Sequence, residues 1–191
     1  MENDVLRTFF GFALPKEVSQ RAATLRTLVD DPKGAVRWVK GINIHLTVRF
    51  LGATPRSAVN EIISAIPEKV AGCSAFTVKL EGTGVFPSPT RPRVLWMGVS
   101  GEISPLQEVE TLIQEVVGPM GFPREERDFT PHITLGRVRY PQKFIPDVSK
   151  FLNVEYEPVV CHLKELHLYQ SILEAGGARY ISLEQFPLAA E

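Results

Sequence analysis

Two short segments of this chain of 191 residues share one pattern: a histidine, an aliphatic residue, a threonine and a second aliphatic residue. They are His45-Leu46-Thr47-Val48 and His132-Ile133-Thr134-Leu135, and they hold two of the four histidines in the chain. Because side chains alternate between the two faces of a β-strand, each segment would turn its imidazole and hydroxyl to one face and its aliphatic side chains to a core. Two such strands could line one cleft.

The residue types in the repeated pattern suit acid-base chemistry on a phosphodiester. Histidine exchanges protons near neutral pH, so one imidazole can activate water as a base while the other protonates the departing alkoxide. The threonine hydroxyls can hold the non-bridging oxygens. A lone histidine on a strand is more often an ordinary core or surface residue, but chance does not readily repeat the whole pattern. The repeat therefore favours His45 and His132 as a catalytic pair.

The strands that must position these motifs are interspersed with helices in no regular order. Gly52 is expected to end the strand of the first motif, and residues 82–93 to form a long hairpin loop. Residues 174–177, which include Gly176 and Gly177, are expected to form a hairpin turn. Periodicity predicts strands at residues 6–14, 36–39, 44–51, 76–80, 94–99, 132–138 and 180–183, with a strand pair or one long bent strand at 159–173.

Helices are expected between these strands. Proline and cap signals with helical periodicity place them at residues 15–29, 54–67, 104–117 and 145–152. Thr54-Pro55 would open the second and Pro67 would end it, while Ser104 starts a capping box for the third. Since hairpin signals outnumber crossover signals, the predicted fold class is α+β with largely antiparallel sheets, as one domain over residues 1–191 with two lobes.

Composition and charge narrow the class of protein. The 21 Lys and Arg residues nearly balance the 22 Asp and Glu residues, and this net charge of -1 argues against a protein that coats long nucleic acid, while it allows a local basic groove. No apolar run approaches the ~18 residues that a membrane span requires, and the acidic start at residues 1–4 is unlike a secretory signal. A cytoplasmic protein with no membrane partner is expected.

The cysteines and the remaining histidines give no metal-binding pattern. Cys73 and Cys161 have no CxxC spacing and suggest no disulfide framework, so buried reduced thiols are expected. His162 and His167 are five residues apart on an extended segment, would face opposite ways and could not chelate one metal together. Neither a metal site nor a cofactor is expected.

Several segments accompany the two motifs, and in this combination they resemble a known family. His132 lies 87 residues after His45, and the accompanying segments are residues 7–12, 38–39, 45–52, 84–87, 92–96 and 130–137. The chain resembles the 2H phosphoesterase superfamily and, within it, the RNA 2',3'-cyclic phosphodiesterases, which are also called 2'-5' RNA ligases. The resemblance covers most of the chain.

This resemblance implies a fold and a reaction. The fold would be bilobal α+β, with two mostly antiparallel sheets flanked by helices and one motif strand from each lobe at a central cleft. The reaction would be metal-independent hydrolysis of RNA 2',3'-cyclic phosphate ends to 2'-phosphates, with reversible 2'-5' ligation, on RNA ends such as tRNA halves and by a monomer. In family terms His45 is the proton donor, His132 is the proton acceptor, and Thr47 and Thr134 hold the phosphate.

Two further residues are candidates for substrate binding. Arg137 matches a family arginine that contacts phosphate, but five residues after the histidine an ideal strand would turn it away, so this role requires a bulge near Gly136 or a side chain that wraps the strand end. Phe86 has two open interpretations, stacking on a terminal base or packing on the core. Four more cations could add positive potential beside the cleft or simply be solvated: Arg91, Arg93, Arg139 and Lys143.

Two other functions stay open at this point. The motifs recognise a phosphate and say little about what is attached to it, so the same chemistry could act on a small cyclic nucleotide or an ADP-ribose cyclic phosphate. The other alternative is a module that binds RNA ends without turnover. The intact copies of both histidines and both threonines argue against this alternative.

Overall fold

The structure is a computed structural model that describes residues 4–125, 128–139, 141, 144–175 and 177–190. None of the described helices is long and apolar enough to cross a membrane. In chain order the elements are β1 (Val5–Ala13), α1 (Lys16–Arg26), β2 (Val36–Trp38), the 3-10 helix η1 (Gly41–Asn43), β3 (His45–Pro55), α2 (Arg56–Val70), β4 (Phe76–Phe86), β5 (Val94–Gly101), α3 (Ser104–Val117), β6 (His132–Val138), α4 (Ser149–Leu152), β7 (Val159–Leu163), β8 (Glu165–Glu174) and β9 (Gly177–Pro187).

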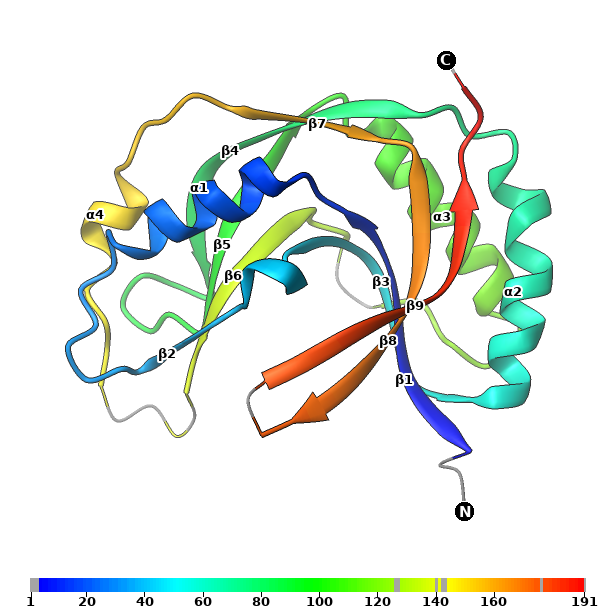
Figure 1. Cartoon of the computed structure of the whole chain (residues 1–191), viewed down its shortest axis with the longest axis horizontal. Helices are drawn as coiled ribbons and strands as arrows, with labels where there is room; N and C mark the ends of the chain where they lie inside the picture. Colours follow the sequence, from blue (N-terminus) through cyan, green and yellow to red (C-terminus); the bar gives the residue numbers. More distant parts are fainter. Residues whose placement is uncertain (1–3, 126–127, 140, 142–143, 176, 191) are drawn as a thin grey trace.

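The strands form two sheets in which the described neighbours pair antiparallel. The strand order is β3-β1-β8-β9 in the first sheet and β2-β6-β5-β4-β7 in the second. Figure 1 shows the two sheets side by side, with the β8–β9 hairpin projecting at the bottom between them. The predicted α+β class with mostly antiparallel sheets is confirmed. Each sheet contains one motif strand, β3 in the first and β6 in the second.

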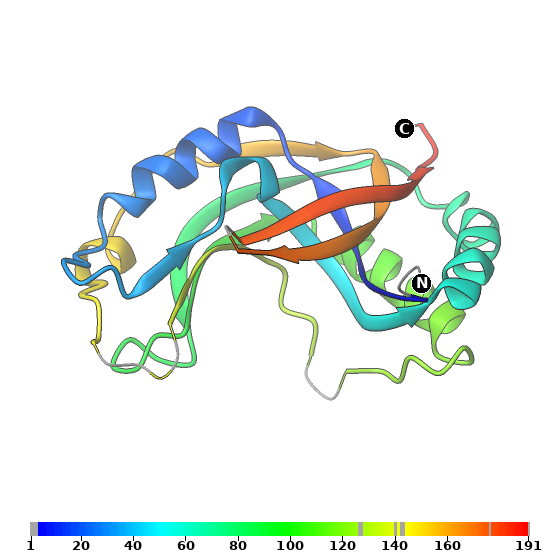
Figure 2. The same cartoon turned by 60° about the horizontal axis from the view of Figure 1, so that its bottom comes forward.

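Helices flank both sheets, and one of them crosses from one sheet to the other. α2 packs on α3, and both contact β3 of the four-stranded sheet. α1 lies along the five-stranded sheet, as Figure 1 and Figure 2 show, and α4 contacts β4. Although α3 connects β5 to β6 of the five-stranded sheet, it packs on the four-stranded one. The buried side chains accordingly form one continuous cluster, which includes Phe10 in β1, Met97 in β5 and Ile113 in α3.

Both motif strands begin at the motif histidine and carry a β-bulge at the same place. The β1–β3 ladder skips Val48 and the β5–β6 ladder skips Leu135, the last residue of each motif. An extra residue in one strand resets the alternation of faces. The fifth residue after each histidine, Phe50 in β3 and Arg137 in β6, is therefore exposed.

Two residues that were expected to end elements lie inside them. β3 continues past Gly52 to Pro55, because Gly52 takes a positive φ of 73° at a second bulge rather than at a turn. Thr54 does not cap α2, since its hydroxyl lies 2.7 Å from that of Thr8 in the buried ladder, and Pro55 occupies the N-cap position. Pro67 lies within α2, whose packed last turn outweighs the one hydrogen bond that a proline removes.

Several other boundaries also differ from the predictions. β4 runs to Phe86 through a bulge at Gly82, so the hairpin loop comprises residues 87–93 instead of 82–93. The segment 159–173 forms two strands that belong to different sheets, β7 and β8. The fourth helix is shorter than 145–152 and β9 is longer than 180–183, while the N-cap of α3 is Ile103, without a side-chain hydrogen bond. In the predicted turn at 174–177, Gly176 lies outside the described residues.

Candidate active site

The first motif lies at the start of β3, where its imidazole is held from several sides. His45 Nδ1 is 2.7 Å from the carbonyl oxygen of Asn43, and its Nε2 is 2.8 Å from the hydroxyl of Thr47. The rings of Phe9 and Tyr180 pack on the imidazole, with centroid distances of 4.8 and 5.0 Å. The ring contacts and the Thr47 hydroxyl come from β1, β9 and β3 itself, and the carbonyl comes from η1, so the four-stranded sheet and η1 together fix the orientation of His45.

The second motif repeats this arrangement on the other sheet. His132 Nδ1 is 2.8 Å from the carbonyl oxygen of Thr130, two residues earlier, just as His45 bonds the carbonyl two residues before it. The ring of Phe86 meets the imidazole edge-on at 5.2 Å. Thr134 is half-buried, like Thr47 of the first motif, and the intervening Ile133 is buried.

The hydrogen bonds of both histidines fix the same tautomer. A carbonyl oxygen can only accept, so Nδ1 of each ring carries a hydrogen, and in the neutral ring Nε2 holds the lone pair. The Thr47 hydroxyl then donates to Nε2 of His45. Nε2 is therefore the nitrogen at which each imidazole can exchange a proton.

The surroundings lower the pKa of both imidazoles below the ordinary value of 6.5. Burial is the largest cause for His45 and for His132, because it disfavours the charged ring. The bonds to the carbonyls of Asn43 and Thr130 oppose this effect, and the positive charge of Arg137 adds to it at both rings. One guanidinium thus acts on both histidines, although they belong to different sheets.

Arg137 reaches this site because of the bulge at Leu135. The predicted requirement for a bulge near Gly136 is therefore met. Arg137, Phe50 and Tyr180 line a pocket of about 490 Å³, and Tyr180 also lines the adjoining pocket that contains His45. Arg137 thus lies beside both motifs and not on the core face.

Phe86 lies at the end of β4, half-buried against the second motif. Its ring contacts Trp96 at 5.2 Å as well as His132. Trp96 in turn lies over Gly84, where an added Cβ would come within 2.0 Å of the indole ring. Phe86 is thus neither wholly in the core nor free in a loop, and its packing supports the imidazole of His132.

The residues of the site that were not singled out from the sequence include Asn43, Phe50 and Tyr180. Phe50 stands five residues after its histidine, as Arg137 does in the second motif, and comparison of the two motifs at that position would have found it. Asn43 lies outside the repeated pattern and binds through its backbone carbonyl. Tyr180 comes from the distant strand β9, and no local signal connects it to His45.

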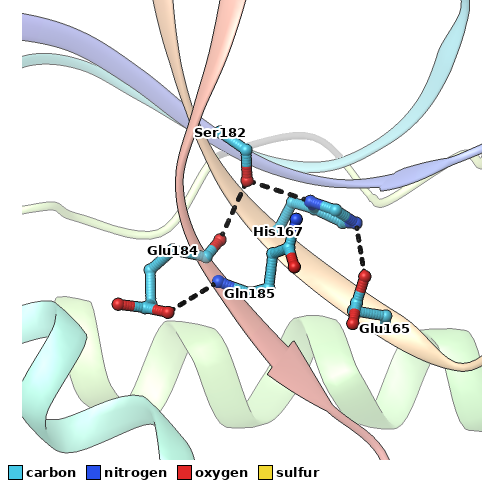
Figure 3. A network of polar contacts seen from close by, with 5 residues as sticks. All are labelled: Glu165, His167, Ser182, Glu184 and Gln185. Carbon is cyan, nitrogen blue, oxygen red and sulfur yellow. Dashed lines mark hydrogen bonds and ion pairs between the residues drawn. The ribbon is translucent and has the colours of Figure 1, made fainter.

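The other two histidines lie away from the motifs. His162 is on β7 and His167 is on β8, so they belong to different sheets. His167 contacts the hydroxyl of Ser182 and the carboxylate of Glu165 (Figure 3), at 3.0 Å from Nδ1 and 3.3 Å from Nε2 respectively. Across the described residues, no group of three or more His, Cys, Asp and Glu side chains could hold a metal ion. Cys73 and Cys161 are free and buried.

The additional cations named from the sequence and described by the structure do not line the pocket next to Arg137. Arg91 and Arg93 belong to the loop 87–93, and Arg139 follows β6 with an exposed side chain. Lys143 lies outside the described residues. Among the residues that the structure describes, different cations line the pocket next to Arg137.

The fold and the two-motif site define a protein class, and comparison with known families agrees. The family model described as "2'-5' RNA ligase superfamily" matches residues 14–173, and the chain belongs to that superfamily.

Similar proteins narrow the identification further. A protein of Aquifex aeolicus named RNA 2',3'-cyclic phosphodiesterase is 31% identical over 187 residues, which cover 96% of this chain and 98% of the relative. An Aeropyrum pernix protein of the same name is 32% identical over 175 residues, with coverage of 89% and 96%. The crystal structure of a Thermus thermophilus protein aligns with a TM-score of 0.78 and 27% identity, over 97% of this chain and 100% of that chain.

Proposed function

We propose that this protein hydrolyses the 2',3'-cyclic phosphate at an RNA end to a 2'-phosphate, with His45 as the acid and His132 as the base. The observation that carries the proposal is the matched pair of imidazoles. Each binds a backbone carbonyl through Nδ1 and keeps Nε2 for proton exchange, and the charge of Arg137 acts on both. Membership of the superfamily and the names of the relatives support the choice of substrate.

The reaction requires one proton transfer at each histidine. Neutral His132 accepts a proton from water at Nε2 as the water oxygen attacks phosphorus in line with the 3'-oxygen. The bond between phosphorus and the 3'-oxygen breaks, and Nε2 of charged His45 gives its proton to that oxygen. The product is a 2'-phosphate with a free 3'-hydroxyl. Afterwards His132 releases its proton to solvent and His45 regains one, which restores the starting state.

Substrate binding prepares His45 for its role. In the free protein, burial and Arg137 keep the pKa of His45 low, so the ring is mostly neutral near pH 7. A bound phosphate anion favours the charged imidazole. The hydroxyls of Thr47 and Thr134 would donate to the non-bridging oxygens, and Arg137 would pair with the same group through two parallel N–H donors.

The same scheme extends to ligation and needs only one chain. If the 5'-hydroxyl of a second RNA end, such as a tRNA half, replaces water, the same two proton transfers give a 2'-5' linkage. Both histidines, both threonines and Arg137 come from one chain, so a monomer would contain the complete site. No step requires a metal ion.

The test is to identify the product. A short oligonucleotide ending in a 2',3'-cyclic phosphate is incubated with the protein, and the product is compared with authentic 2'- and 3'-phosphate standards by chromatography or phosphorus NMR. The proposal expects only the 2'-phosphate. A 3'-phosphate would mean that the cyclic ester binds with His45 beside the 2'-oxygen, and no reaction would reject the proposed activity.

A further inference from the structure

The pocket that contains Arg137 has a charge pattern that the catalytic step does not use. It is lined by four cations, Arg7, Arg37, Lys40 and Arg137, and by no Asp or Glu residue among the described residues that line it. The whole chain carries a net charge of -1, so this concentration is local. Two sheets contribute to it, because Arg7 lies on β1 and Arg37 on β2.

Two of these cations are direct neighbours across a strand pair. Arg37 on β2 pairs with Arg137 on β6, and both side chains are exposed. Directly opposed residues of an antiparallel pair have Cβ atoms only about 4.5–5.5 Å apart, and like charges at such positions destabilise a sheet. In the described part of the chain no carboxylate forms an ion pair with either guanidinium. A bound anion beside Arg37 would offset this repulsion.

The reacting phosphate cannot account for all of this charge. A cyclic phosphodiester carries one negative charge, and Arg137 with protonated His45 already faces it with two positive ones. Arg7 and Arg37 remain, next to Arg137 in the same pocket of about 490 Å³. Both Arg7 and Arg137 also act on the pKa of Tyr180, whose ring packs on His45, so the extra cations lie close to the catalytic centre.

We infer that Arg7 and Arg37 form a second phosphate subsite, which binds the phosphate attached to the 5'-oxygen of the terminal nucleoside. In an RNA substrate this is the last internal phosphodiester, one nucleotide from the cyclic end. The inference rests on the proposed function, and it makes an oligonucleotide a better substrate than a nucleoside 2',3'-cyclic phosphate.

Three substrates test the subsite: adenosine 2',3'-cyclic phosphate, the same compound with a 5'-phosphate, and an ApA dinucleotide with a 2',3'-cyclic end. Hydrogen bonds to charged groups are worth enough to change affinity about 10- to 100-fold. The wild type should show that gain in kcat/KM for the second and third substrates over the first. In Arg37→Met and in Arg7→Met the ratio of dinucleotide to mononucleotide kcat/KM should fall about tenfold, and Arg37→Lys should recover part of it.

The salt dependence of dinucleotide KM gives a second measurement. For single strands, the logarithm of the binding constant falls with the logarithm of the salt concentration, with a slope of about 0.7 for each phosphate contact. The slope measured for the Arg7→Met/Arg37→Met double variant should therefore be smaller than that of the wild type by about 0.7. Arg56→Met, at an exposed position in the first turn of α2, is the matched control and should keep the wild-type ratio and slope.

The outcomes separate this inference from the proposed function. If the wild type hydrolyses none of the three substrates, the proposed function and the subsite are both rejected. If it hydrolyses all three with similar kcat/KM, only the subsite is rejected. If kcat/KM is higher for the dinucleotide but not for the 5'-phosphorylated mononucleotide, the pocket binds the second nucleoside and the inference is wrong. If kcat/KM is higher for both substrates, and the Arg7 and Arg37 variants lose this increase equally for both, Arg7 and Arg37 bind the phosphate.

Discussion

Each motif imidazole has Nδ1 bound to the backbone, and the proposed mechanism uses its Nε2 for proton transfer. This division matters because an imidazole that can rotate or change tautomer delivers its proton from the wrong atom. The carbonyls of Asn43 and Thr130 prevent this in the same way at the two motifs. Neither carbonyl requires a particular side chain, so the arrangement depends on where each strand begins.

Removal of either imidazole tests the acid-base pair. His45→Ala and His132→Ala should each lower turnover of a cyclic-phosphate oligonucleotide by about 10² to 10⁴, the usual contribution of one proton transfer. His162→Ala is the matched control, since His162 is exposed on β7 and bonds only Thr77 among the described residues. Circular dichroism checks the fold. Near wild-type turnover in a folded His45→Ala or His132→Ala protein would reject the assignment.

The lowered pKa values of the two histidines predict where activity is highest. The proposed mechanism requires free protein with charged His45 and neutral His132, and the population of this form is largest between two pKa values that both lie below 6.5. The maximum of kcat/KM should therefore lie on the acidic side of neutrality. The kcat maximum should lie at higher pH, because the bound phosphate raises the pKa of His45. A kcat/KM maximum above pH 7 would contradict the role of burial.

Arg137 should influence the same pH profile. Its charge lowers the pKa of both imidazoles, so in Arg137→Met both pKa values rise and both limbs of the kcat/KM profile move to higher pH. The rate at the maximum should also fall, because a charge-assisted contact to phosphate is lost. Arg56→Met serves as control. A lower rate with unmoved limbs would mean that Arg137 binds phosphate without acting on the histidines.

The sequence could predict the four motif residues but not all of their neighbours. A histidine and a threonine two residues apart on a strand must share a face, so His45, Thr47, His132 and Thr134 follow from alternation alone. The side on which Arg137 lies depends on a bulge, and no residue type at Leu135 or Gly136 dictates one. The contact between Tyr180 and His45 could not be predicted for a different reason, since it arises from the pairing of strands that are distant in the sequence.

At the scale of elements, the repeated bulge makes the two motif strands equivalent beyond the motif itself. Both strands place a buried residue directly after the bulge, Arg49 in β3 and Gly136 in β6. Gly136 lets β2 approach, because a Cβ there would meet Val36 and Trp38 within 3.0 Å. Arg49 instead reaches out of β3 to the segment that leads into the second motif, where Nη2 donates to the carbonyl of Pro123.

Arg49 is therefore expected to stabilise the connection between the two motifs. Its side chain is buried, and its Nη1 is 3.1 Å from the carboxylate of the largely exposed Glu125. Arg49→Met keeps the apolar stem and should lower the free energy of unfolding by about 1.5–3 kcal/mol, as for hydrogen bonds to charged groups. Urea unfolding measures this, with Arg56→Met as the control. An unchanged midpoint would show that the link contributes nothing to stability.

Element types were easier to predict than element ends. β6 begins and ends as predicted, because its alternation is bounded by Pro131 before the strand and a polar segment after it. The element ends predicted at Gly52 and Pro67 were wrong. Gly52 lies at a bulge inside β3 and Pro67 lies inside the last turns of α2, and tertiary packing decides whether such a residue ends an element. The division of 159–173 between two sheets depends on which strand each half meets, and such pairings leave no local pattern.

At the scale of the molecule, consecutive elements of the chain belong to or pack on different sheets. β2 and β3 belong to different sheets although only residues 39–44 separate them, and α3 leaves the five-stranded sheet to cover the other. We propose that the two lobes therefore form one cooperative domain. Because each sheet supplies one motif histidine, independent opening of either lobe would separate the proposed acid from the proposed base.

Cooperativity can be measured because both tryptophans of the chain, Trp38 and Trp96, lie in the five-stranded sheet. Leu168→Ala truncates a fully buried side chain of β8 in the other sheet and should cost about 2–5 kcal/mol. If the lobes unfold together, the tryptophan fluorescence transition in urea shifts as far as the circular dichroism transition. Val160→Ala, at a largely exposed position of β7, should shift neither. A fluorescence transition that stays in place while the circular dichroism curve splits would show that the five-stranded lobe is stable alone, and that the continuous core does not couple the two histidines.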